Sequence, residues 1–192
     1  MRIGLYGGTF DPVHLGHVHA ALAVQDALQL DHVRMVLSAR PGHRAQPSTE
    51  NAHRWEMLKL ACGEHPALIA DDSEIQRPGF SYAIDTLQQF RAAYPQAQLC
   101  WIMGMDSYLT LPTWHDWQGL VDFAHLIVVQ RPGQQSAMDK ELESFQQHFQ
   151  ADSLGTSRAG SIVLLSIPML DISATQVLSL IHISEPTRPL RI

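Results

Sequence analysis

The sequence predicts a Rossmann-like, doubly wound α/β fold, with a mostly parallel sheet of about five strands and helices on both faces. Short apolar runs typical of buried strands alternate with helical patterns along the chain. The first apolar run leads through a glycine turn into a helix and then a second apolar run, which is a βαβ unit. A chain of 192 residues is also long enough for one domain that buries roughly 70% of its unfolded surface.

Composition and charge argue against a nucleic-acid-binding, exported or membrane-spanning protein. The net charge is -6 with neutral histidines, and the basic residues are scattered, which argues against nucleic acid as the main partner. Cys62 and Cys100 lie in apolar stretches without C-x-x-C spacing, so we expect reduced core thiols in a cytoplasmic protein. We expect neither export nor a membrane span, because the chain begins with a strand and no stretch approaches 18 apolar residues.

The stretch that follows the first apolar run, residues 3–6, is predicted to bind phosphate. Gly7 and Gly8 would let the backbone turn sharply and leave no Cβ in the way of a ligand's phosphates, and Thr9 adds a hydroxyl. A helical pattern starts near residue 15 or 16, so the free N–H groups of that helix should face the loop.

Two histidines stand at the start of this helix. His14 and His17 are three residues apart, where the helix dipole favours anions, and both imidazoles could donate to one phosphate. The alternative is that they are accidental surface residues in a chain with 11 histidines. The loop has neither a Walker lysine nor the G-x-G-x-x-G fingerprint, so the histidines are expected to supply the positive charge.

The remaining elements follow from apolar runs and helical spacing. We expect strands or extended segments at 32–38, 66–76, 98–103, 123–130 and 162–167. We expect helices through residue 61, with Ser48 or Thr49 as the cap, over 82–94, with Ser81 as the cap, and over 134–150.

Three loops at the ends of the predicted strands have two interpretations each. His43 and Arg44 form either a solvated face or a ligand contact, and Asp106 either caps a helical turn or contacts a ligand. A pair of tryptophans, Trp114 and Trp117, either plugs the edge of the core or stacks on a planar ring.

Residues 7–17, Gly-Gly-Thr-Phe-Asp-Pro-Val-His-Leu-Gly-His, resemble the H-x-G-H signature of the nucleotidyltransferase superfamily of α/β folds. Its members transfer a nucleoside monophosphate from a nucleoside triphosphate to a second phosphate-bearing substrate and release pyrophosphate. The loop Pro41-Gly42-His43-Arg44, the pair Ser81-Tyr82 and the Trp114 loop resemble the nicotinate-nucleotide adenylyltransferase family. The alternatives are a nicotinamide-mononucleotide or phosphopantetheine adenylyltransferase, or a catalytically inert nucleotide-sensing protein.

The resemblance implies the substrates and the residues that meet them. The substrates would be ATP and nicotinate mononucleotide, with Mg²⁺ held through the ATP phosphates and few direct protein ligands. Catalytic roles fall on His14, His17 and Arg44. The ATP contacts would be Gly7, Gly8, Thr9, Phe10, His14, His17, Gly104, Asp106, Ile172, Ser173 and Thr175. The mononucleotide contacts would be Thr9, Arg44, Tyr82, Ala83, Thr86, Trp114 and Arg131, with Ala83 standing where the family has threonine. A homo-oligomer is one of the oligomeric states that the sequence leaves open.

The resemblance covers residues 1 to about 177, which we expect to form the nucleotidyltransferase domain. Leu178 stands where the family has arginine, so it offers no charge to a triphosphate. Residues 178–192 contain Pro186 and Pro189, have no amphipathic stripe, and resemble a translated cloning or sequencing sequence. We expect a foreign or frame-shifted tail.

Overall fold

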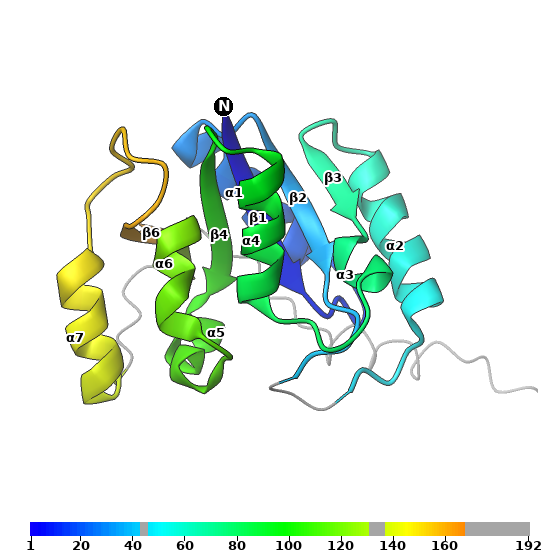
Figure 1. The fold of residues 1–192 in the computed structure, drawn as a ribbon. Helices are drawn as coiled ribbons and strands as arrows, with labels where there is room; N and C mark the ends of the chain where they lie inside the picture. Colours follow the sequence, from blue (N-terminus) through cyan, green and yellow to red (C-terminus); the bar gives the residue numbers. More distant parts are fainter. Residues whose placement is uncertain (43–45, 131–136, 168–192) are drawn as a thin grey trace, which may run out of the picture.

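The computed structural model describes residues 1–42, 46–130 and 137–167. Within these ranges the chain forms one sheet of six parallel strands in the order β3-β2-β1-β4-β5-β6 (Figure 1). The prediction of a parallel sheet is confirmed, with six strands instead of about five. Their bounds are β1 (Arg2–Gly8), β2 (His32–Leu37), β3 (Leu68–Asp71), β4 (Gln98–Gly104), β5 (His125–Gln130) and β6 (Ile162–Ser166).

Helices connect the strands and cover both faces of the sheet. The longer ones are α1 (Leu15–Leu28), α2 (Asn51–Gly63), α4 (Ala83–Ala93) and α7 (Lys140–Phe149). Shorter ones are α3 (Ser73–Gln76), α5 (Met105–Leu109), α6 (Leu120–Phe123) and the 3-10 turns η1 (Leu111–Thr113) and η2 (Trp117–Gly119). The strand order reverses direction at β1 and β4, so the doubly wound prediction is confirmed.

The core has two layers because alternate residues of each strand point to opposite faces. On β4, Leu99 and Trp101 pack with the buried faces of α4, α5 and α6. Their neighbours Cys100 and Ile102 pack with α1 and α2 on the other side, and Figure 1 shows α4 and α1 on opposite faces of the sheet. Both faces of the strand are therefore covered, which is why it is an unbroken apolar run.

One predicted extended segment is helical, and one predicted strand begins later than expected. Residues 73–76 form α3 instead of continuing the third strand, and α6 ends at residue 123, so the strand expected over 123–130 begins at His125. The helix expected over 134–150 begins at Lys140, where the Asp139 carboxylate caps it by accepting from the backbone N–H of Leu142 at 2.8 Å. These differences are local because the expected order of strands along the chain is unchanged.

The predicted caps of α2 and α4 are wrong. Glu50 and Tyr82 occupy the N-cap positions, and neither side chain makes a capping hydrogen bond. The polar side chains before each helix instead form hydrogen bonds with residues that are distant in the sequence. Ser81 Oγ accepts from the backbone N–H groups of Ala39 and Arg40, each at 3.1 Å, and so joins the β2 end to the start of α4.

Cys62 and Cys100 are buried free thiols, as expected, and burial raises the pKa of Cys62 to about 11. In the described part of the chain, no helix combines the length and the apolar character that a membrane crossing requires.

Candidate active site

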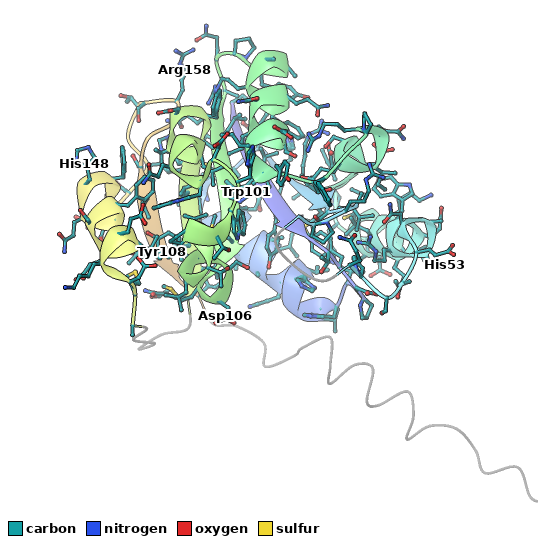
Figure 2. All side chains as sticks on the ribbon, turned by 60° about the horizontal axis from the view of Figure 1, so that its bottom comes forward. His53, Trp101, Asp106, Tyr108, His148 and Arg158 are labelled. Carbon is teal, nitrogen blue, oxygen red and sulfur yellow. The ribbon has the colours of Figure 1, made fainter. Side chains whose placement is uncertain are left out.

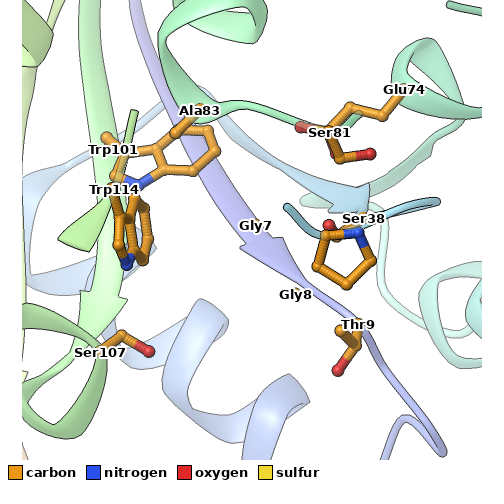
Figure 3. Close-up of a pocket in the computed structure, with 11 residues that line it drawn as sticks. Gly7, Gly8, Thr9, Ser38, Glu74, Ser81, Ala83, Trp101, Ser107 and Trp114 are labelled. Carbon is orange, nitrogen blue, oxygen red and sulfur yellow. The ribbon is translucent and has the colours of Figure 1, made fainter. Parts of the chain in front are cut away.

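Two adjoining cavities lie where β1, β2 and β4 end. Both are lined by Gly7, Gly8, Thr9, Trp101, Ser107 and Trp114. The larger, of about 370 Å³, is also lined by the two histidines, and we call it the histidine cavity. The smaller, of about 60 Å³, is also lined by Ser38, Pro41, Glu74, Ser81 and Ala83, and we call it the serine cavity. Figure 3 shows the end of β1 running between Trp101 and Trp114 on one side and Ser38 and Ser81 on the other.

Gly7 and Gly8 leave room for neighbouring aromatic rings and do not form a turn. Neither has a positive φ, and β1 continues through Gly8, so the predicted sharp glycine turn is wrong. A Cβ at Gly7 would lie 2.8 Å from the Trp101 ring, and one at Gly8 would lie 2.8 Å from the Phe10 ring. The chain turns two residues later, at Phe10, whose φ of 46° lies in the left-handed region. The bare backbone of both glycines remains open to both cavities.

Gly7→Ala is therefore expected to destabilise the protein by about 1–3 kcal/mol, since the added methyl overlaps a buried indole. Trp101 is 3% exposed and cannot swing into solvent. Thermal unfolding measures the effect. The matched control is Gly63→Ala at the end of α2, where nothing lies within 4 Å of the added Cβ. Equal melting temperatures for the two variants would contradict the packing role.

The two histidines form a stacked pair at the start of α1. Their ring centroids are 3.8 Å apart with an interplanar angle of 29°. His17 Nδ1 accepts from the backbone N–H of His14 at 3.3 Å, and the Phe10 ring meets the His17 ring edge-on at 5.1 Å. An Nδ1 that accepts carries no proton, so the neutral His17 ring holds its proton on Nε2. His17 is thereby oriented as a donor through Nε2.

Both rings are neutral at pH 7 in the ligand-free protein. Burial, reinforced by His14, lowers the pKa of His17 to about 3, and burial also lowers the pKa of His14. The expectation that the histidines supply positive charge is therefore wrong for the free protein. They offer neutral N–H donors, and a bound anion would raise both pKa values.

Acid should destabilise the fold through these rings. Burial also lowers the pKa of His32 and of the fully buried His125. Unfolded histidine titrates near pH 6.5, so below that pH the unfolded chain binds more protons and stability falls. For His17 alone the loss at pH 5 is about 2 kcal/mol. Burial raises the pKa of Glu74, which acts in the opposite sense.

Thermal unfolding at pH 7.5 and pH 5 measures this dependence. The wild-type melting temperature should fall with acid, and His17→Gln should show a shallower fall because its side chain does not titrate. Identical slopes for the two proteins would contradict the assigned pKa of His17.

The predicted contacts at the end of β4 reach the cavity. Gly104 is the N-cap of α5 and Asp106 is exposed in its first turn, and both line the histidine cavity (Figure 2). The N-cap position belongs to Gly104, so Asp106 does not occupy it, and its contact with a ligand stays a prediction. Trp114 is half-buried and lines both cavities, whereas Trp117 is 8% exposed and belongs to the core.

The start of α4 forms a wall of the serine cavity. Ala83 lines the cavity, whereas Tyr82 lines neither cavity and its ring centroid lies 4.5 Å from that of His115. Thr86 is fully buried and lines neither cavity, so the structure does not bring it to the predicted site, and its contact with the mononucleotide stays a prediction. Its hydroxyl donates to Glu74 Oε1 at 2.6 Å and so fixes the position of Glu74, which lines the serine cavity.

Sequence reasoning missed two buried charged residues at this edge, Glu74 and Arg54, which are 4% and 1% exposed. Neither interrupts an apolar pattern in a way that signals burial. Arg44, Arg131, Ile172, Ser173, Thr175 and the 178–192 tail lie outside the described residues, and their roles stay predictions. Among the described residues, no three His, Cys, Asp or Glu side chains converge to hold a metal ion.

Comparison with known proteins identifies the family of this chain. The cytidylyltransferase-like family model matches residues 5–179. A probable nicotinate-nucleotide adenylyltransferase of Aeromonas salmonicida is 41% identical over 189 residues, covering 97% of this chain and 88% of that protein. One from Hydrogenovibrio crunogenus is 38% identical over 185 residues, covering 96% and 88%.

Solved structures share the fold. Plasmodium falciparum nicotinic acid mononucleotide adenylyltransferase complexed with NaAD superposes with a TM-score of 0.68 at 17% identity, covering 93% of this chain and 82% of that one. Because the family model spans most of the chain and relatives near 40% identity cover it almost entirely, the chain belongs to the nicotinate-nucleotide adenylyltransferase family of cytidylyltransferase-like proteins.

Proposed function

We propose that this protein transfers the adenylyl group of ATP to nicotinate mononucleotide, which gives deamido-NAD and pyrophosphate for NAD biosynthesis. The chain is a nucleotidyltransferase by family. The observation that carries the specific proposal is the pair of joined cavities at one sheet edge. The histidine cavity suits a triphosphate, and the serine cavity, with Trp114 on its wall, suits the pyridine ring of a mononucleotide.

The reaction needs positioning and charge stabilisation more than proton transfer. The 5′-phosphate oxygen of the mononucleotide is already an anion, attacks the α-phosphorus in line, and displaces pyrophosphate. His17 offers its Nε2–H, held in that tautomer by His14, to the oxygens that gain charge in the transition state. The two substrates meet above Gly7, Gly8 and Thr9, which line both cavities and where neither glycine has a side chain to keep them apart.

Magnesium fits this site as an ion carried by the nucleotide. Mg²⁺ keeps several waters and binds phosphate oxygens with one or two carboxylates, and it neutralises phosphate charge. Asp106 presents an exposed carboxylate to the histidine cavity and is the described residue suited to hold it there, directly or through water. Arg44, Arg131, Ile172, Ser173 and Thr175 are proposed as further contacts from the family motifs alone.

Pyrophosphate release from ATP tests the proposal, with nicotinate mononucleotide, nicotinamide mononucleotide and phosphopantetheine offered in turn. We expect the highest kcat/KM with nicotinate mononucleotide and a deamido-NAD product by mass spectrometry. A preference for either of the other acceptors would replace the proposed substrate. ATP binding without turnover of any acceptor would favour the nucleotide-sensing alternative.

A further inference from the structure

Arg54 is a buried cation on the first turns of α2 that faces the sheet edge. It is 1% exposed, and among the described residues no carboxylate lies within ion-pair distance of it. Burial lowers its pKa, and the negative charge of Asp11 opposes that shift. A buried charge without an ion pair is costly unless hydrogen bonds satisfy its donors.

All five N–H donors of this guanidinium are used. Nη1 donates to the carbonyls of Thr9 at 2.6 Å and Ser38 at 2.9 Å, and Nη2 donates to the carbonyl of Ala39 at 3.3 Å. Nε donates to the carbonyl of Thr49 at 3.0 Å, and Nη2 also donates to the Asn51 side chain. The Thr9, Ser38 and Ala39 carbonyls lie just past the ends of β1 and β2.

Asp11 makes a second connection between the same two segments. Its Oδ2 accepts from Ser48 N at 2.9 Å, Ser48 Oγ at 3.1 Å and Thr49 N at 3.3 Å. Burial alone would raise the pKa of Asp11, but the hydrogen bonds from Thr49 and Ser48 together lower it. The turn at residues 9–11 is thus held to the start of α2 from both of its ends.

Phe10 lies between these two anchors. It is 2% exposed with a left-handed φ of 46°, a conformation that persists only where the surroundings impose it. Its ring meets the His17 ring edge-on at 5.1 Å with an interplanar angle of 88°. The contacts therefore run without a gap from Arg54 and Asp11, through the backbone around Phe10, to the histidine ring.

We propose that Arg54, assisted by Asp11, is a positioning residue for adenylyl transfer: its five hydrogen bonds fix the turn at residues 9–11 and thereby the Phe10 ring that holds His17 in place. This inference rests on the proposed function and assigns to it a residue that touches neither cavity. The planar guanidinium has five donors in fixed directions, so it can bond at once to the backbone after β1, after β2 and before α2.

The test compares Arg54→Lys, Arg54→Met and Asp11→Ala with Lys59→Met as the matched control. Lysine keeps the charge but has three donors on a flexible stem, so it should not restore the geometry. Both Arg54 variants should lose kcat by about tenfold to 100-fold, as expected for a small misplacement of reacting groups. Their KM for nicotinate mononucleotide should change by less than about threefold, because the loss falls on transition-state contacts. Lys59→Met removes an exposed cation of the same helix, which pairs with Glu56 at 2.8 Å, and should stay within about twofold of wild type.

A second readout does not depend on turnover. NMR titration of the His17 imidazole in the ligand-free protein should move from a pKa of about 3 toward the ordinary range in the Arg54 variants, because the ring is released from its packing. A folded Arg54→Met protein with wild-type kcat and wild-type His17 titration would overturn the inference.

If Arg54→Met does not fold, the Asp11→Ala variant is used instead, because Asp11 is only partly buried and its loss should be tolerated. Wild-type kcat and wild-type His17 titration in that variant would refute the inference. Absence of pyrophosphate release from wild type with every acceptor would refute the proposed function instead, and the titration would still decide the positioning role.

Discussion

His17→Ala is expected to lower kcat by about 100-fold to 1,000-fold, the usual cost of one preorganised donor, while the KM for ATP changes little. The His17 ring is oriented before substrate arrives, because the His14 N–H fixes its tautomer and the Phe10 edge fixes its plane. Its Nε2–H should meet a charge that grows only as pyrophosphate leaves. The loss should therefore appear in steady-state kcat at saturating concentrations of both substrates.

Two amide variants separate the functions of the ring nitrogens. In His17→Asn the side-chain amide oxygen can still accept from the His14 N–H, but no donor lies near the position of Nε2. We therefore expect kcat to fall almost as far as in His17→Ala. Gln in place of His17 brings an amide nitrogen near Nε2 and should retain part of the rate. His53, which is exposed on α2, provides the control His53→Ala with unchanged kcat (Figure 2). Wild-type kcat combined with weaker ATP affinity in His17→Ala would assign His17 to ground-state binding.

Trp114→Ala is expected to weaken the binding of nicotinate mononucleotide by about 1–3 kcal/mol, by analogy with bases that stack on aromatic side chains. Trp114 lines both cavities and also packs partly against the core beneath α4. Its indole is thus supported on one face and available on another. The KM for the mononucleotide should rise, and the KM for ATP should rise less.

Trp117→Ala is the matched control for this prediction. Trp117 is 8% exposed, contacts Phe145 at a ring separation of 4.7 Å and lines neither cavity. It should lose more thermal stability than Trp114→Ala and leave the mononucleotide KM unchanged. Trp114→Phe should recover part of the affinity because a ring remains. If Trp114→Ala leaves the KM for the mononucleotide unchanged and lowers the melting temperature as much as Trp117→Ala does, Trp114 is a core residue and not a ligand contact.

The sequence predicted those features that local pattern controls. The buried strand β4 is an unbroken apolar run, and α1 begins where helical spacing starts. His14 and His17 were placed together because three residues along a helix bring side chains to one face. Asp106 and Trp114 were found because each follows a predicted strand or helical turn at the edge where ligands bind.

Features that depend on distant partners were missed. Ser81 was expected to cap its own helix but bonds to Ala39 and Arg40, some 40 residues earlier. Arg54 sits in an amphipathic pattern as an ordinary helix residue, and only the folded structure brings Thr9 and Ser38 to it. The neutral state of the histidines also depends on burial, which the sequence does not state.

The shared lining of the two cavities has a consequence for ligands that span them. Gly7, Gly8 and Thr9 line both cavities, so a molecule in the histidine cavity and one in the serine cavity contact the same end of β1. A compound that joins a nucleotide-like half to a pyridine-like half therefore turns its second contact into an intramolecular one, and its affinity gains from effective concentration. The joined cavities thus favour two-headed ligands as probes of this site.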